Sequence, residues 1–474
     1  MDSSSKLSPQ LRTSTSQRII MTNKLEKKYQ NCLKLKPNLK LCSVAVNSPN
    51  SSLTNVSNLT KNKSLELAPL KSKGLISQKP SLNFVTSHKI LFTEKDVRSE
   101  FMLELNDYER QEIKLYTDVV YAGKKQNKIE PNPMGKNYNF DTENGNYRLI
   151  KGDHIAYRFE IVTFIGKGAF GVVCECIDHK YNERVAVKIL KNKKCFHRQG
   201  NVEINILKVV NENDESNTHT VKMISNFIFR NHICLVFELL FCNLYEYLKL
   251  NNMQGLKVKL IKNFVQQILQ TLKYLESLMI IHCDIKLENL VLVSKTSNAL
   301  KLIDFGSSCY QYDKIYSYIQ SRYYRSPEVI LGIPYTSSID MWSLGCVIAE
   351  LYTGKVLLPG DNEKNQLMLI IELLGLPPEY LINKSPRKKL FFNKDNTFKY
   401  TTFTDSRPLI PGSRKIIWPD NYIWDFVKSC LHWDPEYRLT PSQGLYHPWM
   451  QYQNKRALPK IKIQSKFKIN EKSK

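Results

Sequence analysis

The segment IHCDIKLEN at residues 281–289 is followed, fifteen residues after its last position, by DFG at residues 304–306. Asp284 can accept a proton from a hydroxyl group, and Lys286 can neutralise negative charge on a group in transfer. The amide of Asn289 and the carboxylate of Asp304 are ligands that suit Mg²⁺. These side chains form the set that phosphoryl transfer to a hydroxyl requires.

A glycine-rich segment, GKGAFG at residues 166–171, lies upstream and fits the pattern G-x-G-x-x-G. Glycines allow the backbone to approach phosphates closely. Dinucleotide-binding folds share the pattern, but there the last glycine opens a helix. Here residues 172–177 alternate between apolar and other side chains, which predicts a strand. A hairpin that covers phosphates is therefore the favoured interpretation.

Lys188 ends the apolar strand VAVK at residues 185–188. A lysine there can hold the α- and β-phosphates of a nucleotide if an acidic residue aims it. Glu203 is the favoured partner, because the apolar residues around it define the inward face of a helix. Glu212 and Glu215 are alternatives, although they lie in a polar loop.

The net charge of +25 is concentrated at the two ends of the chain. Residues 1–100 contain 17 Lys and Arg against 6 Asp and Glu, and residues 451–474 contain 8 against 1. The basic residues are dispersed among Ser, Asn and Thr, which favours solvated tails. Binding to a nucleic acid, an anionic lipid or an acidic partner is the alternative.

The composition divides the chain into four parts. Residues 1–90 are predicted to be a basic, largely disordered tail, residues 91–157 an accessory segment, residues 158–449 the main domain and residues 450–474 a second basic tail. Residues 124–147 are polar and contain prolines, which indicates an irregular connector. A short, half-buried helical segment is predicted from Phe101, Leu103, Leu105, Tyr108, Ile113, Leu115 and Tyr116.

The main domain changes its pattern from strands to helices. Alternating apolar residues predict strands within residues 159–164, 166–176 and 184–190. From Val258 onward helical spacing dominates. The predicted fold class is α+β, with a small β-rich lobe followed by a larger helical lobe. The first helix of that lobe is predicted from Ile261, Phe264, Val265, Ile268, Leu269, Leu272 and Leu275.

Cysteine usage indicates a reducing compartment. The eleven cysteines include no C-x-x-C pair, and Cys174, Cys234 and Cys346 lie in apolar segments, so reduced thiols are expected. No signal peptide or apolar run of membrane-spanning length is evident. An intracellular protein is predicted, with cytoplasm and nucleus both open. A zinc site at His282 and Cys283 is disfavoured, since no second pair stands at suitable spacing.

The segments around residues 281–289 and 304–306 resemble the catalytic loop and the metal motif of protein kinases, with the usual central Arg replaced by Cys283. SSCY at residues 307–310 and YSYIQSRYYR at residues 316–325 are similar to the dual-specificity tyrosine-regulated kinases, the DYRK family of the CMGC kinases. The segments at residues 107–113, 141–147 and 153–159 resemble the accessory segment and DH box of class II members. The resemblance covers about residues 100–450, and it implies the bilobal kinase fold.

The resemblance implies ATP and Mg²⁺ as cofactors, with Asp284 and Lys286 at the transferred group and Asn289 and Asp304 on the metal. A large ring at the gatekeeper position would close the back of the adenine pocket. The nucleotide site implied in this way comprises Ile165, Gly166, Lys167, Gly168, Ala169, Phe170, Gly171, Val173, Ala186, Lys188, Phe237, Glu238, Leu239 and Leu240.

The loop after the metal motif carries Tyr316 and Tyr318. In the family the second loop tyrosine is phosphorylated by the kinase itself, which by match is Tyr318, and Arg322 and Arg325 are placed to take its phosphate. Since Cys283 replaces an arginine that pairs with a phosphorylated loop in many kinases, other arginines must hold this loop.

Three further residues match structural positions of the kinase fold. Glu328 and Arg438 are expected to form a buried ion pair that pins the substrate loop. Asp340 resembles the helix residue that ties down the backbone of the catalytic loop. Leu287, in place of the usual proline, and Ser326, in place of alanine, depart from the general pattern without removing a charged group.

These features predict an ATP-dependent dual-specificity kinase that phosphorylates Ser and Thr of protein substrates and its own Tyr318. Substrates are expected to be proline- and arginine-directed, because Arg325 could shape the pocket after the acceptor and Glu288 could receive an upstream arginine. A scaffold that has the same fold without turnover is the alternative.

Overall fold

The computed structural model describes residues 101–214, 216, 218–314, 317–403 and 405–451. The predicted basic tail at residues 1–90, the first ten residues of the predicted accessory segment, Tyr316 and residues 452–474 of the second predicted tail lie outside the described residues. Among the helices that the structure describes, none is both long enough and apolar enough to cross a bilayer.

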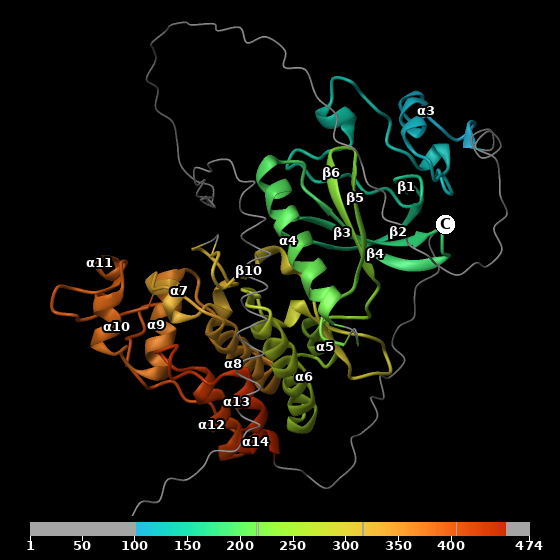
Figure 1. The fold of residues 1–474 in the computed structure, drawn as a ribbon. Coiled ribbons are helices and arrows are strands. Elements are labelled where there is room, and N and C mark those ends of the chain that lie inside the picture. Colours follow the sequence, from blue (N-terminus) through green and yellow to red (C-terminus); the bar gives the residue numbers. More distant parts are fainter. Residues whose placement is uncertain (1–100, 215, 217, 315–316, 404, 452–474) are drawn as a thin grey trace, which may run out of the picture. The chain divides into compact units, whose positions relative to one another are not determined.

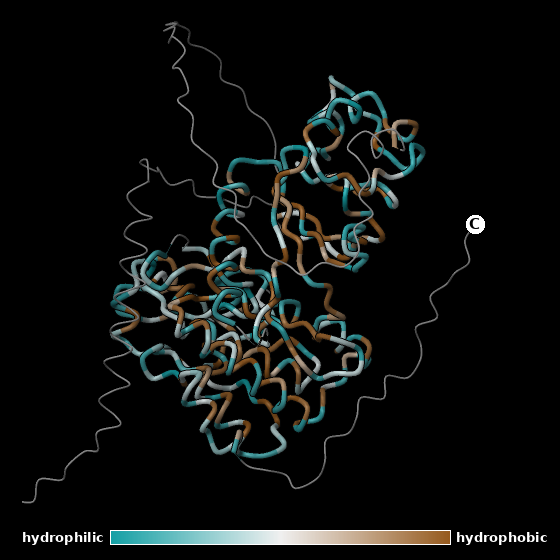
Figure 2. Tube along the Cα trace, turned by 45° about the vertical axis from the view of Figure 1, so that its right-hand side comes forward, coloured by the Kyte–Doolittle hydropathy of each residue, from teal (hydrophilic) through white to brown (hydrophobic). Residues whose placement is uncertain are grey.

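Six antiparallel strands form the first sheet, in the order β1-β2-β3-β4-β6-β5 (Figure 1). Alternation along β3 buries Val172, Cys174 and Cys176 on one face, as the period of two requires. Apolar stretches therefore run along these strands (Figure 2). The strands are β1 His154–Ile155, β2 Phe159–Lys167, β3 Gly171–Asp178, β4 Glu183–Leu190, β5 Met223–Phe229 and β6 His232–Glu238.

Helix α4, Lys194–Asn213, follows β4 in the chain and precedes β5. It packs against the sheet (Figure 1). Its buried face carries Ile204, Leu207 and Val210 at helical spacing. Glu203 lies on the same face, so the apolar stripe that docks the helix also turns this carboxylate inward.

The part of the chain after β6 is mainly helical, and its core forms between α6 and α8. Every apolar position predicted for the helix beginning at Val258 is buried in α6, which confirms that prediction. The helices are α5 Leu244–Leu250, α6 Val258–Ser277, α7 Pro327–Leu331, α8 Ser338–Thr353, α9 Glu363–Leu374, α10 Glu379–Lys384, α11 Lys388–Phe391, α12 Asn421–Cys430, α13 Pro441–Tyr446 and α14 Pro448–Gln451.

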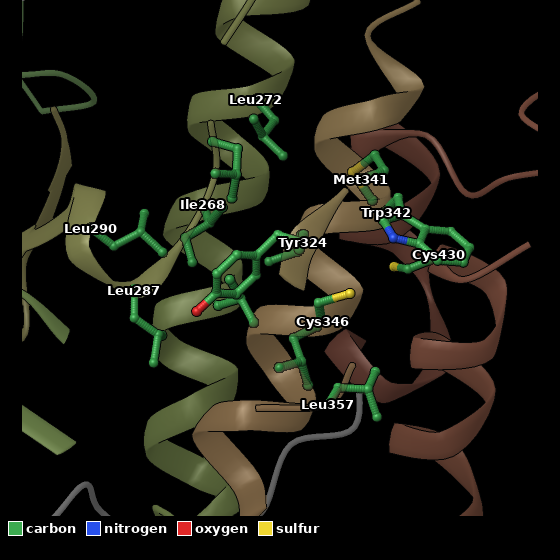
Figure 3. Close-up of a cluster of buried hydrophobic side chains, with 14 of the residues drawn as sticks. Ile268, Leu272, Leu287, Leu290, Tyr324, Met341, Trp342, Cys346, Leu357 and Cys430 are labelled. Carbon is green, nitrogen blue, oxygen red and sulfur yellow. The ribbon is translucent and has the colours of Figure 1, made fainter. Parts of the chain in front are cut away.

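Short strands bracket the chemistry-bearing segments within this helical part. Two antiparallel pairs form there, β7 Ile280–Ile281 with β10 Cys309–Tyr310, and β8 Leu290–Leu292 with β9 Leu300–Leu302. Leu287 and Leu290 pack in the same apolar cluster as Ile268 of α6 (Figure 3). The segment between β7 and β8 is therefore anchored to the apolar core of the helical part. Three 3₁₀ turns lie in this part of the chain: η4, Leu287–Asn289, within that segment, η5, Phe305–Ser307, between β9 and β10, and η6, Arg322–Tyr324, after β10.

The accessory segment is packed more selectively than its sequence predicted. It forms α3, Asp107–Glu112, and the 3₁₀ turn η1, Ile113–Leu115. Leu105 and Ile113 are buried, whereas Leu103 and Leu115 are 85% and 82% exposed. The expectation that the last two are half-buried was wrong, because the helical turns are too short to bring all the apolar residues to one side.

Residues 124–147 are irregular, as expected, but they are more than a connector. They contain the 3₁₀ turns η2, Lys125–Asn127, and η3, Lys136–Asn139. Phe140 and Tyr147 are buried in the apolar cluster beneath the sheet. Their rings anchor this irregular segment to the apolar core of the sheet.

A charged cluster joins the accessory segment to the sheet, and we call Glu109, Lys128, His154 and Arg230 the accessory cluster. The Glu109 carboxylate accepts hydrogen bonds from Lys128 at 2.6 Å and Arg230 at 3.1 Å, and its other contact is His154 Nε2 at 3.0 Å. Arg230 also donates to Glu112 at 2.9 Å. Because two cations already share Glu109, these groups form an ion-pair network and not a metal site.

Candidate active site

A cavity of about 310 Å³ opens between the sheet and the helical part, a size suited to a small-molecule ligand. The glycine-rich turn, β4, the segment after β6 and the segment around Asp304 contribute its walls. Most of the predicted nucleotide site lines it, namely Ile165, Gly166, Gly168, Phe170, Gly171, Val173, Ala186, Lys188, Phe237, Glu238, Leu239 and Leu240.

Lys188, Glu203 and Asp304 meet at the back of this cavity, and we call them the cleft cluster. Lys188 Nζ lies 2.6 Å from Glu203 Oε1 and 2.7 Å from Asp304 Oδ1. Burial by itself lowers the pKa of Lys188, but the charges of Asp304 and Glu203 outweigh it and raise the pKa above its ordinary value. The ammonium group therefore stays charged.

The two carboxylates of the cleft cluster differ in their environments. Burial raises the pKa of Glu203, whose side chain is 2% exposed. Burial also acts on Asp304, but the charge and hydrogen bond of Lys188 hold its pKa below the ordinary value. Asp304 is the more exposed of the two at 27%, and it stands at φ +64°, ψ +74° in the left-handed region. Its carboxylate is ionised and faces the cavity.

Asp284 is the centre of a second group of polar side chains. Its carboxylate accepts hydrogen bonds from Lys286 Nζ at 2.6 Å and from Asn289 Nδ2 at 3.2 Å. Ser321 Oγ donates to Asp284 Oδ1 at 2.7 Å and accepts from Lys286 Nζ at 3.2 Å. Burial by itself lowers the pKa of Lys286, but the charge and hydrogen bond of Asp284 outweigh burial and raise the pKa above its ordinary value. A hydroxyl group can thus sit within hydrogen-bond reach of both residues.

The glycine-rich turn leaves space above the cavity. A Cβ at Gly166 or Gly168 would meet nothing within 4 Å, whereas a Cβ at Gly171 would lie 2.0 Å from the carbonyl oxygen of Ile189. Gly171 is therefore required by strand packing, and the first two glycines leave room for a ligand. Two predicted members, Lys167 and Ala169, are not among the lining residues, since Lys167 ends β2 in an exposed position.

Known proteins are similar to this chain in sequence over most of its length. The sequence matches the protein kinase domain over residues 159–450. It is 44% identical over 389 residues to dual specificity tyrosine-phosphorylation-regulated kinase 4 of Homo sapiens, covering 81% of this chain and 74% of that protein. It is 46% identical over 368 residues to dual specificity tyrosine-phosphorylation-regulated kinase 2 of Drosophila melanogaster, and the match covers 76% of this chain and 51% of that protein. The chain spans about half the length of that fly relative.

The chain belongs to the dual specificity tyrosine-phosphorylation-regulated kinases. It is a protein kinase, and the predicted α+β fold with a small β-rich lobe and a larger helical lobe is confirmed. Dual specificity tyrosine-phosphorylation-regulated kinase 3 of Rattus norvegicus is 41% identical over 426 residues, and the match covers 84% of this chain and 72% of that protein. The family implies ATP as the phosphoryl donor and protein substrates.

The kinase holds its catalytic loop by the backbone. Asp340 of α8 accepts hydrogen bonds from the backbone N–H of His282 at 2.8 Å and of Cys283 at 3.0 Å. Burial raises the pKa of Asp340 to about 7, although these two bonds act in the opposite direction. The structure thus brings Asp340 to the loop that it was predicted to tie down.

Cys283, which replaces the usual arginine, lies in an apolar environment. It is fully buried in a cluster with Cys309, Ile319 and Tyr335, and its φ is +66°. A guanidinium group there would need an anion that these neighbours do not supply. The replacement therefore converts a charged contact to the activation loop into an apolar one.

Glu328 and Arg438 form the buried ion pair expected of them. Two parallel bonds join Arg438 Nη1 and Nη2 to the Glu328 carboxylate at 2.6 and 2.9 Å. Both side chains are at most 1% exposed. Such a bidentate pair fixes the end of the activation loop in one geometry.

The arginines of the activation loop are used in two ways. Arg325 is 2% exposed, and its Cζ lies 4.0 Å from the centre of the Tyr318 ring, which is 61% exposed. Arg322 donates instead to the backbone carbonyls of Gly360 and Asp361. The structure thus brings Arg325 to the predicted phosphorylation site and holds Arg322 elsewhere.

Sequence reasoning missed several residues of the site. Val291 and Ile303 line the cavity, and Ser321 contacts Asp284. Val291 follows Asn289 by two positions in an apolar strand, a signal that could have identified it. No local pattern points to Ser321, because its contact spans 37 positions of the chain.

Proposed function

We propose that this kinase transfers the γ-phosphoryl group of ATP to Ser and Thr hydroxyls of proteins and to its own Tyr318. The observation that carries the proposal is that the cleft cluster lines one cavity together with Asn289, whose amide donates a hydrogen bond to the Asp284 carboxylate. The names of the relatives describe dual specificity and regulation by tyrosine phosphorylation, which supports the same assignment.

In the proposed reaction Asp284 accepts the proton of the acceptor hydroxyl. The hydroxyl oxygen forms a bond to the γ-phosphorus while the bond from that phosphorus to the bridging oxygen breaks, and ADP leaves. Lys286, 2.6 Å from Asp284, would stabilise the negative charge on the group in transfer. The Ser321 hydroxyl, 2.7 Å from Asp284, occupies the kind of position that an acceptor needs.

The residues present suit a nucleotide with Mg²⁺. Asp304 and Asn289 offer a carboxylate and an amide oxygen, and both line the cavity. Mg²⁺ bound with ATP would neutralise phosphate charge, and Lys188, aimed by Glu203, would hold the α- and β-phosphates. The open space above Gly166 and Gly168 is where the phosphates would pass.

The substrate preference is proposed from two residues. Gln320 adopts φ +64°, and its carbonyl oxygen accepts a hydrogen bond from Arg325 Nη2 at 2.8 Å. With that carbonyl engaged, a backbone N–H after the acceptor residue would lose a partner, and proline has no N–H to lose. Glu288 is exposed at the edge of the cavity and could receive an upstream arginine.

Peptide mass spectrometry of protein made in bacteria tests the proposal, with Asp304→Asn as the inactive control. We expect phosphate on Tyr318 of the wild type and none on the variant, together with transfer to peptides that contain Arg and Pro. Phosphate-free Tyr318 and no peptide turnover in wild type would favour a scaffold without catalysis. Turnover without a preference for Arg or Pro would refute only the proposed specificity.

The basic ends could add binding of an anionic partner. The 17 basic against 6 acidic residues at positions 1–100 supply the positive charge that such binding would use. Binding that weakens steeply with salt, and that disappears on deletion of residues 1–90 and 451–474, would distinguish a partner site from solvated tails.

A further inference from the structure

Tyr318 is placed for its phosphate to meet a second arginine besides Arg325 of the activation loop. Its ring lies over the guanidinium of Arg325, at 4.0 Å from Cζ to the ring centre, and 61% of the residue is exposed. The ring is thus held against a buried cation while its outer part is accessible to solvent. A phosphate added to this side chain stays next to positive charge.

A second guanidinium, from outside the activation loop, joins Arg325 through one carboxylate. Glu363 of α9 accepts from Arg325 Nη1 at 3.3 Å and from Arg387 Nη1 and Nη2 at 3.2 and 2.7 Å. Arg387 stands just before α11 and also donates to the carbonyl oxygen of Ile330 at 2.7 Å. The hydrogen bond and charge of Glu363 outweigh burial and raise the pKa of Arg387, and Tyr318 lies close enough to contribute to this rise.

The charges at this place are not balanced. Two guanidinium groups share the single negative charge of Glu363, which leaves one positive charge in excess. Burial raises the pKa of Glu363, but the hydrogen bond and charge of Arg387 and the charge of Arg325 hold it below the ordinary value. A phosphate monoester carries close to two negative charges and three acceptor oxygens, so it suits a pair of arginines better than one carboxylate does.

We propose that Arg387 binds the phosphate of Tyr318 together with Arg325, and that this phosphate takes over the bonds that Glu363 now makes to the two guanidinium groups. The inference rests on the proposed autophosphorylation of Tyr318. Arg387, from the segment before α11, would then take part in regulating the activation loop. In the unphosphorylated protein the Glu363 carboxylate binds the two guanidinium groups that the phosphate would bind. Phosphorylation then ties the activation loop to the region around α9 and α11.

The test compares phosphorylated wild type with Arg387→Gln, Glu363→Gln and Lys388→Gln. Lys388 is the matched control, since it carries the same charge one position away and its Nζ contacts Asn383 at 2.9 Å. Intact mass and peptide mapping first establish phosphate on Tyr318. The rate at which a broad-specificity tyrosine phosphatase removes it is then measured, along with Tm before and after removal.

We expect Arg387→Gln to lose its Tyr318 phosphate about tenfold faster than wild type, the effect of losing one charge-assisted bond. We expect Lys388→Gln to match wild type and Glu363→Gln to be slower, because the competing carboxylate is gone. The gain in Tm from phosphorylation should shrink in Arg387→Gln and grow in Glu363→Gln. After dephosphorylation the Arg387→Gln protein should melt close to wild type, which shows that it is folded.

Three outcomes would overturn the inference. Equal phosphatase rates for Arg387→Gln and wild type would exclude Arg387 from the site. A folded Arg387→Gln protein without Tyr318 phosphate would also contradict it, because Arg387 is assigned a part only after transfer. Wild type without phosphate on Tyr318 would remove the proposed autophosphorylation as well, so the two failures are distinguishable.

Discussion

The cleft cluster and the accessory cluster bury similar charges and use them differently. In the cleft cluster one lysine faces two carboxylates, and Asp304 is 27% exposed beside the cavity. In the accessory cluster one carboxylate, Glu109, meets several donors, and every side chain is at most 1% exposed. Excess negative charge next to open space can bind a metal and a nucleotide. Charges that are paired and sealed from water can only fix a geometry.

The largest expected effect is loss of catalysis from the cleft cluster. Lys188→Met should lower phosphorylation of a protein substrate by about a thousandfold or more, because the phosphates lose their cation. Radiometric assay with labelled ATP measures this. Lys180→Met, at an exposed turn where Lys180 pairs with Asp118, is the matched control and should retain activity. Turnover of Lys188→Met within tenfold of wild type would refute the role assigned to the cleft.

The accessory cluster should show the reverse, a loss of stability with intact chemistry. Arg230→Met leaves Glu112 without its buried cation and Glu109 with Lys128 as its remaining lysine or arginine partner, at a cost of about 3–4 kcal/mol in the free energy of unfolding. Urea unfolding measures this. Arg110→Met, which removes an exposed pair with Asp107, should change the free energy by less than about 0.5 kcal/mol. Equal stabilities of the two variants would mean that the cluster does not clamp the accessory segment.

The smallest expected effect is a dependence of stability on acid that arises from Glu109. Burial raises its pKa, but the hydrogen bonds and charges of His154 and Lys128 outweigh burial and lower the pKa to about 2. A carboxylate with a lowered pKa stabilises the fold above its unfolded pKa, near 4.5, and the gain disappears as the pH falls towards 2. The gain lost in this range is about 3 kcal/mol.

Two neighbours of Glu109 titrate with opposite signs in the adjoining range. Burial lowers the pKa of His154 to about 4 and raises that of Asp153 to about 6. As the pH falls, protonation of His154 therefore lowers the free energy of unfolding, and protonation of Asp153 raises it. Urea unfolding of wild type and Glu109→Gln from pH 6 to pH 2.5 isolates the Glu109 contribution. Parallel profiles for the two proteins would show that Glu109 contributes none of the acid dependence.

Local patterns predicted much of the fold because burial imposes a period on each element. The apolar residues of α6 recur at helical spacing, and those of β3 alternate. The same reasoning favoured Glu203, which is buried on the inward face of α4. Glu212, expected in a loop, lies in the last turn of α4 but is exposed, and Glu215 lies outside the described residues. It failed for Leu103 and Leu115, where short turns with little regular spacing leave side chains exposed.

The contacts that join distant segments could not be read from the sequence. Glu363 and Arg387 are 24 positions apart and meet through packing of α9 against the segment before α11. Arg322 and Arg325 look equivalent in sequence, yet only Arg325 lies against the ring of Tyr318.

The sequence by itself determined the order of the elements, the family and the side chains to which the proposed chemistry is assigned. Periodicity and motif spacing depend on residues that are close together in the chain, so they can be recognised from the sequence alone. The tertiary structure alone decided that Ser321 contacts Asp284, that Arg230 seals the accessory segment and that Glu363 links two arginines beside Tyr318. These depend on which distant surfaces pack together, and on how far each charge is removed from water.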